Sequence, residues 1–290
     1  MGPEVTVVIP TRDRPAGLAA ALAALRAQTL AADRFEVIVV DDGSAPPAGV
    51  PDPVRLLRHG ASRGPAAARN TGWRAARAPL VAFTDDDCTP APGWVEGLLA
   101  AAEEGTVVQG RVEPRAGEEA GPRTHTVAAG GPNRLFVTAN VAYPRALLEA
   151  LGGFDEWFRR ACGEDIELGA RAVASGARVR FAADALVFHE VRRLSLRDHV
   201  RQAVKWADAV RVLKLHPHLR GELAMGVFWR PSHAPFLLAL AGLLARRPLL
   251  VAPYLVSLLR RGAPARLVVV DAAEVATMVA ASARHRTLML

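Results

Sequence analysis

The first hundred residues alternate between short apolar runs and longer segments in which apolar side chains recur every three or four positions. Short runs rich in Val, Ile and Leu, ended by Pro, Gly or Asp, are typical of buried strands. They predict strands at residues 5–10, 35–44, 54–59 and 80–83. The helical spacing predicts helices at residues 16–28, 64–76 and 93–104. Such alternation predicts an α/β fold with a mainly parallel central sheet and helices on both faces.

The pattern changes in the rest of the chain. A polar loop is predicted at 113–126, helices at 146–156 and 164–176, and one or two strands at 177–190. Residues 196–213 place Leu, Val and Ala on one face and Arg and Lys on others, which predicts a basic amphipathic helix. Residues 234–264 hold two apolar stretches, each too short to span a bilayer and each closed by an arginine pair. We therefore expect a first domain at 1–190 and a helical extension at 191–290.

Polar clusters follow directly after three of the predicted strands. They are TRDR at 11–14, DDGS at 41–44 and TDDD at 84–87. Because parallel strands end at one edge of a sheet, and ligands bind there, the clusters should meet. Three adjacent acids repel one another unless something positive lies among them. A solvated turn explains each cluster taken singly, but the set favours a cation or ligand site.

Charge and cysteine content restrict the partners. The formal net charge is +7, which favours anionic partners such as nucleotides or an acidic membrane. No aromatic–basic platform or helix-turn-helix pattern suggests nucleic acid. The two cysteines, Cys88 and Cys162, lack CxxC spacing, and the N-terminus lacks a basic region followed by an apolar one. We therefore expect a reducing compartment: the cytoplasm, with a possible place at the cytoplasmic face of the membrane.

The motifs, taken in order, resemble a known family. VVIPTRDRP, VIVVDDGS, RGPAAARNTG, FTDDDC, GGFDE, GEDIELGAR and VFH occur over about residues 4–190. This ordered set is similar to the family 2 inverting glycosyltransferases, which have the GT-A fold, a Rossmann-like sheet flanked by helices. The resemblance implies transfer of a sugar from a nucleoside diphosphate, with UDP expected, to a hydroxyl of a glycan, glycolipid or small-molecule acceptor.

The same resemblance implies roles for individual residues. The nucleotide would be bound by residues that follow the strands or lie in RGPAAARNTG: Pro10, Thr11, Asp13, Asp41, Asp42, Arg63, Arg69, Asn70, Asp85 and Asp86. Asp42 is preferred over Asp41 as the contact to base or ribose. The family usually has Asn before the glycine where this chain has Arg63, so the role of Arg63 is open.

The remaining implied roles concern the metal, the base and the sugars. Asp85 and Asp87 would form the DxD motif, with Mn²⁺ or Mg²⁺ held by Asp87, Asp85 and His189. Asp165 would be the general base with Glu164 beside it, although either could instead cap the helix. Asn140 and Trp157 are expected beside the donor or acceptor sugar.

The chemistry explains why such residues are needed. Negative charge grows on the departing diphosphate, and a hard cation held by carboxylates stabilises it. A hydroxyl is a poor nucleophile, and a carboxylate that takes its proton increases the rate by about 10²–10⁴-fold. If residues 85–87 continue the strand, Asp85 and Asp87 point the same way and Asp86 points away.

Alternatives remain at this point. A sugar-phosphate nucleotidyltransferase also uses paired aspartates, but PTRDRPAGLAA is a poor match to its phosphate loop. A non-catalytic nucleotide-sugar-binding protein is disfavoured by the intact GED. The extension either packs as a helical cap or contacts a membrane peripherally, and we favour the membrane. The sequence does not identify the sugar, acceptor, linkage or oligomeric state.

Overall fold

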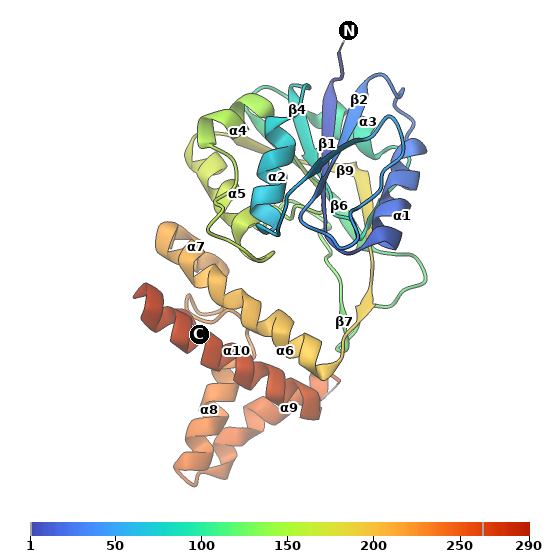
Figure 1. Ribbon diagram of the computed structural model, residues 1–290. Coiled ribbons are helices and arrows are strands. Elements are labelled where there is room, and N and C mark those ends of the chain that lie inside the picture. The colour runs from blue at the N-terminus through green and yellow to red at the C-terminus, as the bar shows by residue number, and fades with distance from the viewer. Residues whose placement is uncertain (1, 263) are drawn as a thin grey trace. The chain divides into compact units, whose positions relative to one another are not determined.

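The computed structural model describes residues 2–262 and 264–290, and Figure 1 shows their helices and strands. The chain divides into two compact units. One takes in the chain up to Glu119 together with Thr126–Val191, and we call it the sheet unit. The other joins Ala120–His125 to Arg192–Leu290, and we call it the helical unit.

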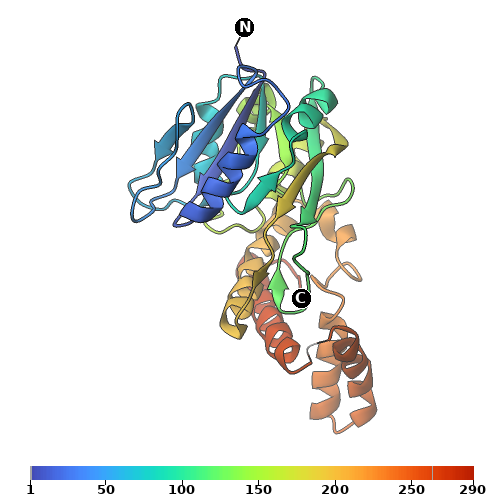
Figure 2. The same ribbon diagram turned by 90° about the vertical axis from the view of Figure 1, so that its right-hand side faces the viewer.

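The sheet unit contains a mixed sheet, whose strands Figure 2 shows side by side. The strands are β1 (Val5–Thr11), β2 (Phe35–Asp41), β3 (Arg55–Arg58), β4 (Leu80–Phe83), β5 (Cys88–Pro90), β6 (Thr106–Pro114), β8 (Val141–Pro144) and β9 (Arg178–His189). Their order across the sheet is β3-β2-β1-β4-β8-β6-β9-β5.

Strand direction determines which loops meet. Parallel pairing joins β1 to β2 and β4, β2 to β3, and β6 to β9. In contrast, β8 runs antiparallel to β4 and β6, and β5 runs antiparallel to β9. The predicted central sheet is confirmed, and it is mixed because β5 and β8 oppose their neighbours. The carboxyl ends of β1, β2 and β4 lie at one edge.

Helices cover both faces of this sheet. They are α1 (Pro15–Arg26), α2 (Pro65–Arg74), α3 (Trp94–Ala101), α4 (Arg145–Leu151) and α5 (Glu164–Ala174). Val7 and Ile9 of β1 share a core cluster with Leu18 of α1, whereas Val8 shares another with Trp73 of α2. Successive strand side chains point to opposite faces, so β1 is covered on both. Each such buried aliphatic side chain contributes roughly 1.5–3 kcal/mol.

Local sequence explains where the helices near the sheet edge begin. α1 and α2 both start with proline, whose fixed φ suits the first helical turn. The first turn of α5 holds Glu164, Asp165 and Glu167, where the helix dipole favours negative charge. Hydrogen bonds tie the starts of α2 and α5 to residues after β2 and β4, at the edge where these strands end.

The helical unit is described on its own. Its helices are α6 (Leu196–Lys205), α7 (Ala209–Leu215), α8 (His233–Leu244), α9 (Ala252–Arg260) and α10 (Pro264–His285), and β7 (Thr124–His125) pairs with β10 (Arg192–Arg193). The single helix predicted at 196–213 is wrong in one respect, because a 3₁₀ turn at Trp206–Asp208 separates α6 from α7. None of the described helices is both long and apolar enough to cross a membrane.

Buried ion pairs hold α10 to its neighbours in this unit. Asp271 and Glu274 of α10 are fully buried. Arg261 donates to both oxygens of Asp271 at 2.7 and 3.0 Å, and Tyr254 donates its hydroxyl at 2.8 Å. Arg230 donates to both oxygens of Glu274 at 2.9 and 2.8 Å. Buried charges are tolerated because each has an opposite partner.

Candidate active site

Loops after β1, β2 and β4 are joined by hydrogen bonds. Thr11, which ends β1 after the half-buried Pro10, donates its hydroxyl to Asp86 at 2.7 Å. The backbone N–H of Asp13 donates to the hydroxyl of Ser44 at 2.9 Å. These contacts link TRDR to both DDGS and TDDD. The expectation that the three polar clusters meet at one edge of the sheet is confirmed.

Arginines compensate the three adjacent acids. Arg69 donates to Asp85 at 2.7 Å. The guanidinium of Arg14 lies 3.3 Å from Asp86 and 3.2 Å from Asp87. Burial raises the pKa of Asp86 to about 6, although its hydrogen bond and the nearby arginine oppose the shift. The repulsion expected from the sequence is therefore balanced by side chains of the protein itself.

The three acids lie in a turn. The backbone N–H of Cys88 donates to the carbonyl of Asp85 at 3.1 Å, which closes the turn before β5. The expectation that residues 85–87 continue an extended strand is therefore wrong. Asp85 contacts Arg69, whereas Asp87 contacts Arg14, so these two carboxylates do not share one arginine partner.

Arg14 is a site residue that the sequence analysis missed. Besides Asp86 and Asp87, it donates to Glu190 at 2.6 Å. It thereby connects the loop after β1, the turn after β4 and the residue that follows β9. Its membership in TRDR was the available signal, but three acids from two distant segments surround it only in the folded chain.

Asp87 and His189 form a pair that fits a divalent cation. The pairing of β5 with β9 brings them together, and Asp87 Oδ1 lies 3.6 Å from His189 Nε2. His189 Nδ1 lies 2.8 Å from the carbonyl of Glu190, and since a carbonyl only accepts, Nδ1 donates. In the neutral ring, Nε2 then directs a lone pair towards Asp87. Two atoms that bind one ion at about 2.1 Å lie no more than about 4.2 Å apart, so the pair fits.

Cys88 completes the cluster of ligand-type side chains with Asp87 and His189. Burial raises the pKa of the Cys88 thiol well above its ordinary value, and the charges of Asp85 and Asp87 add to the shift. The thiolate, which is the form that binds metals, is therefore disfavoured. The carboxylate and the imidazole are the better ligands.

Arg69 connects the acidic turn to the N-terminus of α5. Its buried guanidinium donates to Asp85 and, at 2.9 Å, to Glu164. The other oxygen of Glu164 accepts the N–H of Cys162 at 2.7 Å, so both oxygens hold the start of α5. Asp165 is half-buried. Burial, and then the charge of Glu164, raise the pKa of Asp165, which suits a group that accepts a proton.

Asp41 forms the turn that follows β2. Its two carboxylate oxygens accept the N–H groups of Ser44 at 2.8 Å and Ala48 at 3.0 Å. Burial opposes ionisation, yet these hydrogen bonds lower the pKa of Asp41 overall. The side chain is fully buried. We therefore correct its expected role from nucleotide contact to turn formation.

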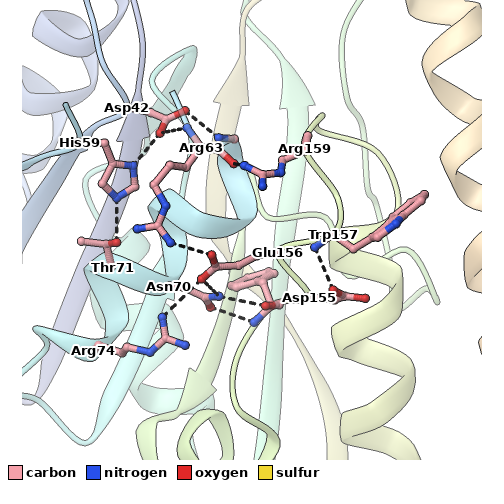
Figure 3. A network of polar contacts seen from close by, with 12 residues as sticks. Asp42, His59, Arg63, Asn70, Thr71, Arg74, Asp155, Glu156, Trp157 and Arg159 are labelled. Atoms are coloured by element: carbon pink, nitrogen blue, oxygen red, sulfur yellow. Dashed lines mark hydrogen bonds and ion pairs between the residues drawn. The ribbon is translucent and has the colours of Figure 1, made fainter. Parts of the chain in front are cut away.

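Asp42 organises the segment between β3 and α2, as Figure 3 shows. One oxygen lies 2.7 Å from His59 Nδ1 and accepts the N–H of Arg63 at 2.8 Å. The other accepts the hydroxyl of Ser62 at 2.6 Å and the N–H of Gly64 at 2.9 Å. A carboxylate has about four acceptor positions, and these contacts use them all. Its contact with base or ribose stays a prediction.

Glu156, in GGFDE, is a second residue that the sequence analysis missed (Figure 3). It accepts hydrogen bonds from Asn70 at 3.0 Å and Arg63 at 2.9 Å, and lies 3.6 Å from Arg74. Asn70 is buried, and its amide also bonds the N–H and the carbonyl of Phe154, each at 2.9 Å. We therefore correct the role of Asn70 from nucleotide contact to joining α2 with the segment after α4.

The two residues expected beside a sugar differ in exposure. Asn140 is buried, accepts the indole N–H of Trp94 at 2.8 Å and donates to the carbonyls of Arg111 and Ala185 at 2.8 Å each. Its amide is held in the core by these three hydrogen bonds, which corrects the expected sugar contact. Trp157 is 41% exposed, so its contact with a sugar stays a prediction.

Family models now complement this geometry. The model described as glycosyl transferase family 2 matches residues 6–148. The model described as glycosyl transferase family group 2 matches residues 122–270. This chain belongs to the family 2 glycosyltransferases. The family resemblance expected from the ordered motifs is confirmed.

Curated relatives of this family 2 glycosyltransferase are named for different acceptors or sugars. Pre-mycofactocin glycosyltransferase of Mycobacterium tuberculosis is 36% identical over 238 residues, covering 74% of this chain and 48% of the relative. Validoxylamine A glucosyltransferase of Streptomyces hygroscopicus is 30% identical over 273 residues, covering 78% of this chain and 63% of the relative. The chain thus spans about half to two thirds of the length of these relatives.

Solved structures support the fold of this family 2 glycosyltransferase. A mannosyltransferase from Pyrobaculum calidifontis, in complex with GDP-Man and Mn²⁺, has a TM-score of 0.57 at 23% identity, covering 99% of this chain and 83% of that one. GalNAc-T7 with UDP, GalNAc and Mn²⁺ has a TM-score of 0.54 at 15% identity, covering 66% of this chain and 43% of that one. The predicted GT-A fold is confirmed.

Proposed function

We propose that this family 2 glycosyltransferase is an inverting, metal-dependent enzyme that transfers a sugar from a UDP-sugar to a hydroxyl of a glycan, glycolipid or small-molecule acceptor. The observation that carries the proposal is the Asp87–His189 pair, 3.6 Å apart beside the arginine-bound acids. Membership in the family and relatives named as glycosyltransferases support it.

Asp87 and His189 would hold the cation in this proposal. When bound, Mn²⁺ or Mg²⁺ supplies positive charge that stabilises the negative charge growing on the departing diphosphate. The imidazole nitrogen of His189 favours Mn²⁺ over Mg²⁺. Arg14 holds one oxygen of Asp87 while the other faces His189, so it orients the carboxylate. Asp85 lies on the same turn but is held by Arg69.

Asp165 is the proposed general base. Both oxygens of Glu164 are already bound, to Arg69 and to a backbone N–H, which leaves Asp165 better able to accept a proton. The acceptor oxygen attacks the anomeric carbon while its proton passes to the Asp165 carboxylate. The bond from that carbon to the phosphate oxygen breaks, and its electron pair leaves with the diphosphate. Attack opposite the leaving group inverts the anomeric configuration.

Nucleotide recognition is proposed for the polar loops after β1 and before α2. Asp13 and Arg63 are exposed and could reach a ligand, whereas Thr11 is buried against Asp86. Asp42 would act mainly by holding the backbone of Arg63. UDP is our proposal for the donor nucleotide; the two similar solved structures are complexes with GDP-Man and with UDP and GalNAc.

Donor turnover tests the proposal directly. Purified protein is incubated with UDP- and GDP-sugars, Mn²⁺ and hydroxyl acceptors, and release of nucleoside diphosphate is measured. We expect Asp87→Asn and Asp165→Asn each to lower release by about 10²-fold or more. The exposed Asp33→Asn is the matched control, since it removes one carboxylate outside this site. Calorimetry with Mn²⁺ alone should show weaker binding for Asp87→Asn.

Other outcomes would contradict the proposal. Pyrophosphate release from a nucleoside triphosphate and a sugar phosphate would indicate a nucleotidyltransferase. Donor binding without turnover on any acceptor would indicate a non-catalytic binding protein. Retention of anomeric configuration in the product, measured by NMR, would contradict the inverting mechanism.

A cytoplasmic location with peripheral membrane contact completes the proposed function. The membrane contact would be made by the helical unit and would bring the protein to a surface that can carry lipid-linked acceptors. The surface best suited to it lies on α8 and α9.

A further inference from the structure

A helical hairpin in the helical unit exposes large apolar side chains. It consists of α8, the 3₁₀ turn Pro248–Val251 and α9, and Figure 1 shows α8 and α9 side by side. Leu243, Leu244, Leu249 and Leu259 are 65%, 80%, 86% and 73% exposed. Three of these leucines lie in residues 243–250, which we call the hairpin tip. Large apolar side chains gathered and exposed at one tip are characteristic of an interaction site.

The hairpin tip has a defined shape. The N–H of Arg247 donates to the carbonyl of Gly242 at 2.7 Å, and Arg246 has a φ of 54°, so the chain reverses tightly after α8. A Cβ on Gly242 would lie 2.7 Å from Cβ of Leu250, which shows how closely the two sides approach. Inside the hairpin, Ala239 packs in one cluster with Tyr254 and other residues of α9 and α10. The outward leucines are therefore held in place.

The composition of α8 points to lipid. The helix reads HAPFLLALAGLL and is apolar on every side. A helix that is apolar all round is found in a protein core or in a membrane, yet Leu238, Leu240, Leu243 and Leu244 are exposed. Its 12 residues extend about 18 Å, well short of a bilayer core of about 30 Å. This length fits a helix that enters the headgroup interface of one leaflet and does not cross the bilayer.

Charge identifies the kind of surface. The hairpin itself, residues 233–260, contains three arginines and no acidic residue. Arg246, Arg247 and Arg260 are exposed on the hairpin. Basic side chains beside exposed leucines complement anionic lipid headgroups. A second copy of the chain, docked by the same face, would instead bring these like charges together.

We propose that the hairpin tip docks on the surface of an anionic lipid bilayer, with Leu243, Leu244 and Leu249 entering the interface and Arg246 and Arg247 contacting lipid phosphates. The proposal deepens the membrane part of the proposed function and is independent of sugar transfer. Its test uses no donor, so its failure would leave the transferase proposal untouched.

Vesicle flotation tests the docking. The full chain is mixed with vesicles of phosphatidylcholine alone or of phosphatidylcholine with phosphatidylglycerol. We expect flotation with the anionic vesicles that decreases at high salt. The variant Arg246→Gln/Arg247→Gln should bind about 30-fold more weakly, and Leu243→Ser/Leu244→Ser/Leu249→Ser about 100-fold or more weakly.

Matched controls separate the hairpin tip from general effects. Arg26→Gln/Arg77→Gln removes the same charge from exposed positions in the sheet unit. Met225→Ser removes another exposed apolar side chain of the helical unit, 80% exposed. Both should float like the unchanged protein. Circular dichroism should show unchanged helix content in every variant.

A fluorescent probe tests insertion. An environment-sensitive dye on Leu249→Cys should shift to shorter wavelength with anionic vesicles, whereas the same dye on Met225→Cys should not. The native Cys88 and Cys162 are buried and should stay unlabelled. Equal flotation with neutral and anionic vesicles would overturn the proposal. An equal loss of flotation in the control variants and the hairpin variants would overturn it as well. So would a lipid-free dimer that the leucine variants convert to a monomer.

Discussion

At the scale of single residues, the acidic turn at 85–87 shows how arginine side chains compensate the charge of adjacent carboxylates. Three adjacent acids repel one another, so we expected from the sequence that a cation lies among Asp85, Asp86 and Asp87. The structure provides Arg14 and Arg69 as well. Because these arginines hold the carboxylates in different directions, one oxygen of Asp87 is left facing His189. Arginine pairing and cation binding are thus compatible in one turn.

The raised pKa of Asp165 predicts how activity depends on pH. A base must be deprotonated to act, so kcat/KM should fall as the pH drops through this raised pKa, above the range of an ordinary aspartate. Asp165→Asn should remove this limb of the profile and lower kcat/KM by about 10²–10⁴-fold. The measurement is kcat/KM for the best donor at a series of pH values.

Glu164→Gln and Asp33→Asn serve as comparisons for that profile. Asp33→Asn should keep the limb and the rate. Glu164→Gln removes one charge that raises the pKa of Asp165, so the limb should move to lower pH. If Glu164→Gln abolishes the limb while Asp165→Asn keeps it, the assignment of the base is wrong.

At the scale of elements, the start of α2 depends on its preceding loop. Asp42 accepts the N–H groups of Arg63 and Gly64, which fixes the loop that enters α2. Gly64 has a φ of 95°, and a Cβ there would lie 2.6 Å from the carbonyl oxygen of Arg159. The glycine of RGPAAARNTG is therefore needed for backbone shape and close approach.

Gly64→Ala should destabilise the protein. The strained φ and the clash with the Arg159 backbone should together lower the free energy of unfolding by about 1–3 kcal/mol. Gly60→Ala is the matched control, since a Cβ at Gly60 would meet nothing within 4 Å. Urea unfolding of both variants measures the difference. Equal stability of the two variants would show that the loop adapts and would contradict the argument.

At the scale of the whole molecule, the chain forms two units with separate cores. Apolar clusters on both faces of the sheet stabilise one, and an apolar cluster with buried ion pairs stabilises the other. In the helical unit, α10 contacts α6, α7, α8 and α9. The long helix thus connects the elements of its unit, including the hairpin that we propose to bind lipid.

Asp271→Asn should weaken the helical unit. The change leaves Arg261 without its charged partner, and loss of one member of such a pair costs about 3 kcal/mol. Hydrogen exchange measured by mass spectrometry should become faster in peptides from residues 230–285. The sheet unit should be unaffected, and Asp33→Asn should change neither unit. Unaltered exchange at 230–285 would show that the ion pair contributes little.

Much of the fold and part of the candidate site follow from local pattern. The strands at 5–10 and 80–83 and the helix with Leu18, Leu22 and Leu25 were predictable, because burial leaves a periodic trace in one short segment. α10 was not, since its acids Asp271 and Glu274 are buried only through arginines elsewhere in the chain. The 3₁₀ turn between α6 and α7 left no equivalent signal.

The sequence by itself determined the family, the strand–helix order and which loops carry acids, because motifs and periodicity are local properties. Only the tertiary structure decided which contacts the polar side chains make. In the folded chain, Asp41 and Asn70 make structural hydrogen bonds and Asn140 is buried in the core. Folding also brings Arg14 and Glu156 into contact with partners that are distant in the sequence. The physical reason is that charge compensation and hydrogen-bond saturation depend on neighbours in space, which the order of residues does not specify.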